Sequence, residues 1–320
     1  MMKNLRGVIQ ALEDSQRVLV CSHVESDGDS IGSQLALAEL LDSLGKEVRT
    51  INQDPVPERY RFLDPQGQIL DHLPSDFRPD TVVILDCSNR ERLGRVGELI
   101  TDGMVIVTID HHRANPGPDD PAYIDLEASS TGELIIDIIH ELKVPIGPRQ
   151  ADRLYTAIFS DTGGFRFPNT TAKSLATAAE LARCGAQPHS IVSRIYERRS
   201  LASLKLLGRA LSKIDTLENG RVAMVSLEAE DLKQCGAGQE EAEGIVDALI
   251  TVENALVGVL TRRMPSGKIK VNLRTRGGLK ANKIAEAMGG GGHPNAAGYR
   301  TTASLEQARS ALLAEIRRWL

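Results

Sequence analysis

The chain has 320 residues, of which 41% are hydrophobic, and its formal net charge is −5. Because this length exceeds that of a usual single domain, we expect two domains of ordinary size. The acidic balance argues against a protein that grips long nucleic acid, since such binding needs a broad basic surface. An aromatic content of 3% argues equally against a long stacking platform for single strands.

We expect no signal peptide at the amino terminus. Residues 1–16 carry charges throughout and lack the apolar core of a signal peptide. No run approaches the ~18 apolar residues of a membrane span. The cysteines are widely separated and form no C-x-x-C pair, at Cys21, Cys87, Cys184 and Cys235. Free thiols in a reducing cytoplasm are the simplest interpretation.

The first half of the chain alternates strands and helices. Apolar runs at 17–23, 81–86 and 104–112 predict buried strands, and residues 47–52 predict another. The apolar spacing within 30–46 predicts a helix between the first two of them. Near-continuous apolar strands are typical of a parallel sheet buried on both faces. We therefore expect an α/β fold built on a doubly wound parallel sheet.

The second half of the chain predicts a smaller α/β domain. From residue 130 onward the pattern becomes helical, and residues 188–211 predict a charged helical connection. Strands are expected at 221–228, 254–263 and 268–276, with helices to cover them. The expected divisions are a first domain, a helical linker and a second domain, at residues 1–188, 189–214 and 215–320.

Acidic residues and histidines gather at the ends of these predicted elements. They form four clusters in chain order, His23 with Asp27 and Asp29, then Asp86, then Asp110-His111-His112, then Asp161. Open α/β sheets build their sites at the carboxyl ends of the strands. Hard divalent ions prefer carboxylate and imidazole ligands, and two such ions ~3.5–4 Å apart can clamp a phosphate and activate a water. The pattern predicts a two-metal hydrolase.

Each cluster also has an ordinary structural interpretation. Asp27 and Asp29 suit a turn and cap before a helix equally well, although Gly28 would allow a tight turn that lets ligands converge. Asp86 could simply cap the next turn, and Asp161 could be a surface residue at a helix end. Two adjacent histidines after a strand-end aspartate are, however, rarely packed for stability alone.

The tripeptide Asp110-His111-His112 resembles the signature of the DHH phosphoesterase family. All four amino-terminal motifs match in order, and the glycine-rich segment 289–298 is similar to the signature of the DHH-associated carboxy-terminal domain. The resemblance spans nearly the whole chain. Length, two-domain layout and the segment 160–167 look most like the NrnA-type enzymes, which cut very short RNAs and remove the 3′-phosphate of pAp (3′-phosphoadenosine 5′-phosphate).

The resemblance implies roles for the clustered residues. The implied ligands divide between two ions, with His23 and Asp27 on one, Asp29, His111 and Asp161 on the other, and Asp86 bridging both. The two divalent ions would be manganese, with magnesium or cobalt as alternatives. The implied catalytic residues are His112, which meets the substrate phosphate and stabilises charge or protonates the leaving oxygen, and Asp110, which orients a ring.

The resemblance also implies that the second domain binds substrate, across a cleft between the domains. The residues involved in the second domain would be Arg274, Gly291, Gly292, His293 and Asn295, and Arg166 of the first domain could also face a phosphate. Closely spaced glycines let backbone N–H groups approach a phosphate, although most such loops are flexible turns. The arginines have structural alternatives as well, because Arg274 could be a surface strand charge and Arg166 an exposed structural residue.

The expected reaction is metal-dependent hydrolysis of short RNA oligonucleotides and pAp in the cytoplasm. No long duplex nucleic acid or membrane is expected as a partner, and a homodimer is one candidate assembly. The alternative activity is that of a phosphodiesterase for cyclic dinucleotides or pApA, because related enzymes of that kind share every motif quoted. A pyrophosphatase of the family is disfavoured, because its second domain lacks a segment like 289–298. A RecJ-like exonuclease is disfavoured because the chain is too short for an extra nucleic-acid-binding domain. Outside catalysis, the alternative is an inactive metal-stabilised nucleotide-binding module.

Overall fold

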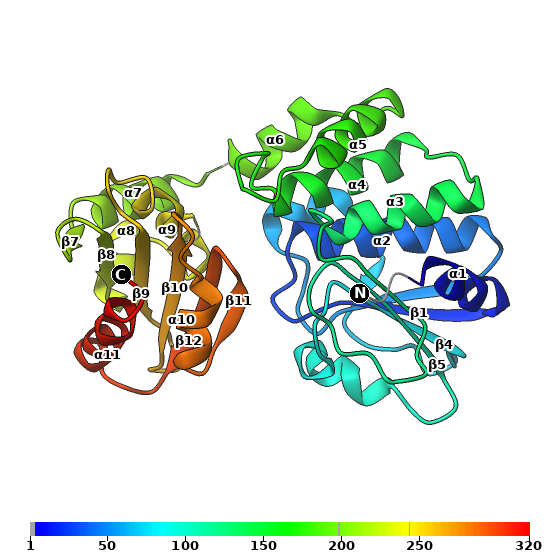
Figure 1. Ribbon diagram of the computed structural model, residues 1–320, viewed down its shortest axis with the longest axis horizontal. Coiled ribbons are helices and arrows are strands. Elements are labelled where there is room, and N and C mark those ends of the chain that lie inside the picture. The colour runs from blue at the N-terminus through cyan, green and yellow to red at the C-terminus, as the bar shows by residue number, and fades with distance from the viewer. Residues whose placement is uncertain (1–3, 198, 243) are drawn as a thin grey trace. The chain divides into compact units, whose positions relative to one another are not determined.

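The computed structural model describes residues 4–197, 199–242 and 244–320, and of His293 it describes the backbone alone. The chain divides into two compact units, Met1–Arg198 and Arg199–Leu320. Each unit has its own sheet (Figure 1). Each also has its own hydrophobic core. This confirms the expected α/β fold with a parallel sheet and a smaller second α/β part.

The first unit is built on a sheet whose six strands are all parallel. The strands lie in the order β3-β2-β1-β4-β5-β6, so the order reverses between β1 and β4. Such a reversal is where open α/β sheets bind ligands. The strand bounds are β1 Arg17–Cys21, β2 Glu47–Ile51, β3 Ile69–Leu70, β4 Thr81–Leu85, β5 Val105–Asp110 and β6 Ala122–Ile124.

Helices cover one face of this sheet, and the 3-10 segment η2 helps to cover the other. Their bounds are α1 Leu5–Asp14, α2 Gly28–Ser43, η1 Glu58–Leu63, η2 Arg90–Leu99, α3 Thr131–Leu142, α4 Pro148–Asp161, α5 Ala172–Arg183 and α6 Pro188–Tyr196. Helix α2 is buried on almost all sides, because α3 and α4 pack on it from outside. Its first turn is closed by a capping box between Asp27 and Ser30.

Glycines allow α4 to pack closely on α2 and α3. A Cβ on Gly32 of α2 would lie 2.4 Å from the carbonyl oxygen of Arg153. A Cβ on Gly132 of α3 would lie 2.7 Å from the Cβ of Ala157. Only glycine permits this approach, which fixes the position of α4 and of Asp161 at its end.

A buried arginine fastens the same helix. The Arg153 side chain in α4 is 2% exposed, and its guanidinium donates to Glu39 Oε2 at 2.6 Å and to Gln68 Oε1 at 2.6 Å. It also donates to the carbonyl oxygens of Leu35 and Leu63. Burial lowers the pKa of Arg153, and the nearby Glu39 carboxylate opposes that shift. Because buried charges need partners, this set ties α4 to α2 and to η1.

The second unit contains a mixed sheet in the order β11-β12-β10-β9-β8-β7. Its strands are β7 Asp215–Leu217, β8 Val222–Leu227, β9 Val257–Arg263, β10 Ile269–Thr275, β11 Gly291–His293 and β12 Ala296–Thr301. Helices α10 and α11 pack on one core, whereas α7, α8 and α9 pack on the other. The bounds are α7 Leu201–Leu211, α8 Ala229–Cys235, η3 Glu240–Ala242, α9 Ile245–Leu249, α10 Ala281–Ala287 and α11 Leu305–Arg317.

The structure adds detail to two predicted segments. The boundary between the units falls within the linker predicted at 189–214, where Ile191 of α6 packs in the first core and Leu206 of α7 in the second. The glycine-rich segment 289–298 is largely a β-hairpin, in which β11 pairs antiparallel with β12. Across residues 4–197, 199–242 and 244–320, no helix combines the length and apolarity that crossing a membrane requires.

We predict that Gly32→Ala destabilises the protein, because the added methyl group meets backbone atoms of α4 that cannot swing away. Overpacking of this kind costs ~1–3 kcal/mol. The matched control is Gly208→Ala in α7, where a Cβ meets no atom within 4 Å. That change should be neutral or stabilise the chain by ~0.5–1 kcal/mol. Urea unfolding followed by circular dichroism compares the two, and equal stability would contradict the proposed close packing.

Candidate metal centre

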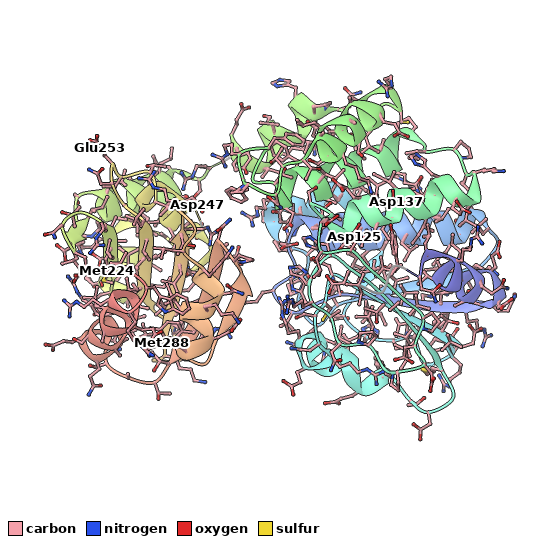
Figure 2. The ribbon with its side chains drawn as sticks, viewed as in Figure 1. Asp125, Asp137, Met224, Asp247, Glu253 and Met288 are labelled. Carbon is pink, nitrogen blue, oxygen red and sulfur yellow. The ribbon has the colours of Figure 1, made fainter. Side chains whose placement is uncertain are left out.

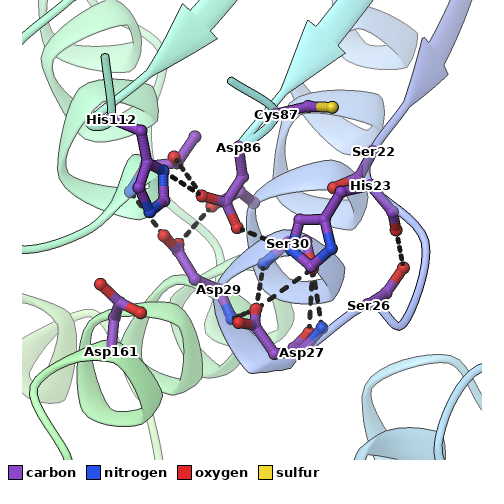
Figure 3. A network of polar contacts seen from close by, with 12 residues as sticks. Ser22, His23, Ser26, Asp27, Asp29, Ser30, Asp86, Cys87, His112 and Asp161 are labelled. Carbon is purple, nitrogen blue, oxygen red and sulfur yellow. Dashed lines mark hydrogen bonds and ion pairs between the residues drawn. The ribbon is translucent and has the colours of Figure 1, made fainter. Parts of the chain in front are cut away.

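The acidic and histidine clusters meet at the carboxyl end of the first sheet, beside the reversal between β1 and β4. His23 follows β1 after one residue, Asp86 follows β4 directly, and Asp110 is the last residue of β5. Asp161 comes from the end of α4 and reaches the same place (Figure 3). Segments separated by more than 100 residues of sequence thus supply one site.

The side chains form two ligand groups that lie against each other. The first contains His23, Asp27 and Asp86, and the second contains Asp29, His111 and Asp161; within each group one ligand atom per residue lies within 4.8 Å of the others. His111 Nε2 is 3.3 Å from Asp161 Oδ2. A further group combines Asp86 and Asp110 with His111 and His112. The structure therefore brings together all the residues of the four predicted motifs.

Asp86 faces both groups. Its Oδ2 atom is 3.5 Å from His23 Nε2, and its Oδ1 atom is 3.6 Å from His111 Nε2. The backbone of Asp86 is left-handed, with φ +52. Aspartate and asparagine tolerate this conformation better than most residues, and it turns the carboxylate inward at the strand end. One carboxylate therefore lies between the two groups, as a bridging ligand requires.

Two histidines are held in the form that binds a metal. His23 Nδ1 lies 2.7 Å from the carbonyl oxygen of Val24, and His111 Nδ1 lies 3.3 Å from that of Ala128. Because a carbonyl only accepts hydrogen bonds, each Nδ1 must carry the proton and donate it. In the neutral rings Nε2 then presents its lone pair toward the carboxylates, which is the usual arrangement of a metal-ligating histidine.

Asp29 is held by the start of helix α3. The N–H groups of Thr131 and Gly132 donate to its carboxylate at 2.7 and 3.0 Å, and the Ser33 hydroxyl donates at 2.9 Å. Sequence reasoning missed Thr131 and Gly132, because it treated this segment only as a helix. The signal was the capping serine at position 130, which marks a helix start with free N–H groups to offer.

Burial and mutual repulsion shift the pKa values of the carboxyl groups in the cluster. Burial raises the pKa of Asp29 well above its usual value, and the charges of Asp86 and Asp161 raise it further. The pKa of Asp161 is raised for the same reasons, by burial first and then by Asp27. Burial also acts to raise the pKa of Asp86, but hydrogen bonds with His112 and His23 leave it well below its usual value.

The donor set fits divalent cations. Asp161 Oδ2 and Asp110 Oδ2 are buried and make no hydrogen bond within the described parts of the chain. Carboxylates and imidazoles are suitable ligands for manganese, magnesium or cobalt, and a cation offsets the repulsion among the carboxylates. The residues that could hold the two ions are the six of the two ligand groups, with Asp86 shared.

His112 differs from the other two histidines. Its side chain is 20% exposed, whereas those of His23 and His111 are 7% exposed. The Asp110 carboxylate fixes the ring through Nδ1 at 2.8 Å and also accepts from the His112 backbone N–H. Burial acts to lower the pKa of His112, but Asp110 and Asp86 raise it to about 11. His112 is thus an oriented imidazole that remains accessible from outside.

Gly28 has a different role from the one expected. The residue belongs to the first turn of α2, rather than to a tight turn before the helix. A Cβ there would lie 2.0 Å from the Ser160 hydroxyl oxygen and 2.8 Å from the Tyr60 ring. Glycine is needed because α2, which starts beside Asp27, and α4, which ends at Asp161, approach closely at this point.

The predicted substrate-binding residues are not among these ligands, and all except Arg166 belong to the second unit. Arg166 donates to the Gly163 carbonyl oxygen at 2.6 Å and lies over the Tyr196 ring. Arg274, in the second unit, pairs with Asp247 at 2.6 Å (Asp247 is labelled in Figure 2). The others lie in or beside the hairpin, with Gly291 and Gly292 in β11, the His293 backbone paired with Ala296, and Asn295 in the turn; the His293 side chain is outside the described part.

Two protein-family models match the chain. A model described as the DHH family, N-terminal domain, matches residues 17–158, and one described as the DHHA1 domain matches residues 218–320. A "Bifunctional oligoribonuclease and PAP phosphatase NrnA" of Thermus thermophilus is 33% identical over 317 residues, which cover 99% of this chain and 93% of that protein. The chain belongs to the DHH family.

A further relative and two solved structures are also similar to this chain. A protein with the same name from Bacillus subtilis is 28% identical over 295 residues, covering 91% of each chain. The crystal structure of an exopolyphosphatase-related protein from Bacteroides fragilis matches with a TM-score of 0.91 at 25% identity, covering 100% of this chain and 97% of that one. Exonuclease RecJ bound to manganese shares the fold, with a TM-score of 0.52 at 16% identity over 99% and 94% of the chains.

We predict that Asp86→Asn abolishes binding of both ions, because one carboxylate faces both groups. Asparagine keeps the size of the side chain and tolerates the left-handed backbone, so the fold should be retained. The comparison is Asp161→Asn, which alters the second group alone and should leave one ion bound. Elemental analysis of the purified proteins gives the metal content, and two ions retained in Asp86→Asn would contradict the bridging position.

Proposed function

We propose that this chain is a two-metal phosphoesterase that hydrolyses short oligoribonucleotides to mononucleotides and pAp to AMP and phosphate. One observation carries the proposal, namely that two ligand groups meet at the reversal point of a parallel sheet and that Asp86 faces a histidine of each. The substrates are inferred from the names of relatives that match nearly the full length of the chain.

Each residue of the two ligand groups has a definite task in the proposed reaction. When bound, two divalent ions, which we propose to be manganese, supply a water of lowered pKa and neutralise the phosphoryl oxygens. His23 and Asp27 would hold one ion, and Asp29, His111 and Asp161 would hold the other. Asp86 faces both groups and would contribute to both. Fixed tautomers and backbone hydrogen bonds keep these ligands in place, so little reorganisation is needed on metal binding.

His112 acts on the substrate in this proposal. Its greater exposure leaves part of the ring accessible beside the ligand groups, where an incoming phosphate would lie. Asp110 holds Nδ1, so that Nε2 is directed toward the phosphoryl or leaving oxygen. We expect this group to stabilise the transition state more than it stabilises metal binding, because Asp110 orients the ring and the ring is more exposed than the ligand histidines.

We assign substrate contacts to the second unit. The Arg274 side chain is 26% exposed and its partner Asp247 is 49% exposed, so the guanidinium can exchange a carboxylate for a phosphate at low cost. Strand β11 is at the edge of its sheet, so one side of Gly291 and Gly292 is not paired within the sheet. Arg166 is a third candidate, although the Tyr196 ring holds it in the structure.

We also propose a cytoplasmic location, in which the four free cysteines stay reduced.

We predict that His112→Gln keeps both ions and loses ~10²–10⁴-fold in kcat, the range expected for a positioned acid or charge-stabilising group. The control is His140→Gln, because His140 pairs with Glu180 on the surface, away from the centre. Metal analysis and steady-state kinetics on pAp are measured together. Loss of metal from His112→Gln would make the residue a ligand, and unchanged turnover would remove it from the mechanism.

We predict a steep dependence on RNA length at fixed manganese and salt. Rates should be high on pAp and on RNAs of about two to five nucleotides and then fall, because an acidic chain offers no basic track to compensate added phosphates. Equal kcat/KM on a dinucleotide and on an RNA of about 24 nucleotides would favour a processive exonuclease instead. Activity confined to pApA or cyclic dinucleotides would identify a phosphodiesterase for those signals.

A further inference from the structure

A buried amide lies behind the loop that carries His23 and Asp27. Asn52 follows strand β2, which contributes no ligand, and its side chain is 1% exposed. Its Oδ1 accepts from the Ser22 backbone N–H at 3.2 Å, and its Nδ2 donates to the Ser26 hydroxyl at 3.2 Å. Nδ2 also donates to Gln34 Oε1 at 2.9 Å. One amide thus contacts two residues of the loop and one of helix α2.

These contacts hold the loop on both sides of His23. Ser22 and Ser26 lie on either side of it in sequence, and both are bonded to the same Asn52 side chain. The Ser26 hydroxyl in turn donates to the His23 carbonyl oxygen at 2.8 Å (Figure 3). The loop between β1 and α2 has no regular secondary structure of its own. Its conformation therefore depends on side chains that bind its backbone.

Gln34 fixes the orientation of this amide. Its Nε2 donates to the Val20 carbonyl oxygen at 2.8 Å and more weakly to that of Ile51 at 3.4 Å, at the ends of β1 and β2. Carbonyls only accept, so the Gln34 amide cannot turn around, and its oxygen must face Asn52. Neither amide has a buried polar atom without a hydrogen bond in the described parts of the chain. A fully satisfied buried network of this kind favours a single conformation.

The carboxylate of Asp29 in the second group has hydrogen-bond donors of its own. Ser33 and the backbone N–H groups of Thr131 and Gly132 donate to it, and Asn52 does not. The two groups meet where Asp86 faces both and where Asp27 Oδ1 accepts from the Asp29 backbone N–H at 3.0 Å. Because Asn52 bonds to the loop of the first group and the Asp29 carboxylate keeps its own donors, a change at Asn52 should weaken the first group and leave the second in place.

We infer that Asn52 and Gln34 are positioning residues that hold the His23–Asp27 loop in the geometry needed to bind the first ion. They touch neither the ligand atoms nor the substrate, and they act through Ser22, Ser26 and the backbone of the loop. The inference rests on the proposed metal centre, so its test must measure that centre in the unaltered chain as well.

The test is a manganese titration of the full-length chain, followed by calorimetry and by electron paramagnetic resonance. Asn52→Asp keeps the shape but replaces the donating NH₂ group with an oxygen that cannot donate to Ser26 and repels Gln34 Oε1. We expect two ions in the unaltered chain. In the variant we expect one site weakened by ~10–100-fold, the usual effect of losing support for a metal ligand, and one site unchanged. The spectrum should change from that of a coupled pair to that of an isolated ion.

The matched control is Asn219→Asp, the same chemical change in an exposed turn of the second unit at φ +58, which aspartate tolerates. It should bind both ions as the unaltered chain does. If Asn52→Asp does not fold, Ser26→Ala removes only the hydroxyl between Asn52 and the His23 carbonyl. That variant should weaken the same single site, by a smaller factor.

The outcomes separate the inference from the function on which it rests. Two unchanged sites in the folded variants, or equal weakening of both sites, would overturn the positioning role while leaving the metal centre standing. Failure of the unaltered chain to bind manganese would overturn the metal centre and the inference with it. Normal turnover of Asn52→Asp at saturating manganese, with impaired turnover at low manganese, would support the inference, because a defect in chemistry is not rescued by metal.

Discussion

Repulsion among buried carboxylates is the constraint on which the first unit depends. Asp29, Asp86 and Asp110 are buried together, with Asp161 close by, and burial raises the pKa of Asp29 and Asp161. Isolated buried charges are too costly to keep unless partners offset them. Imidazoles, helix N–H groups and hydroxyls offset part of the cost here, and divalent cations would offset the rest. The cluster is therefore understandable as a cation site and difficult to explain as a structural core.

The packing of α4 determines whether the cluster is complete. Three motifs come from strand ends or the turn beside them, but Asp161 comes from a helix and must be brought to the same place. Gly32 allows the backbone of α4 to approach α2, and Gly28 leaves room for the Ser160 side chain of α4. Arg153 fastens the pair with buried hydrogen bonds. The distance between His111 and Asp161 thus depends on contacts along the whole length of α4.

Much of the site was predictable, because strand ends are local features of a sequence. The apolar runs before His23, Asp86 and Asp110 predicted buried parallel strands, and parallel strands place their carboxyl ends at one edge. The glycine-rich segment 289–298 was less predictable. Its composition suggested an open phosphate-binding loop, whereas the structure pairs β11 with β12, since Gly290 and Gly292 permit backbone approaches that a Cβ would block.

The sequence by itself determined the fold class, the order of the strands along the chain and the residue types that meet at the centre. Those properties follow from periodicity and from the polarity of a few side chains. Tertiary structure alone decided which groups support the ligands. Thr131 and Gly132 reach Asp29 across 102 and 103 residues of sequence, and Asn52 reaches Ser22 across 30. Such contacts leave no periodic pattern in the chain, because each depends on where a helix start or a strand end comes to lie after the core has packed.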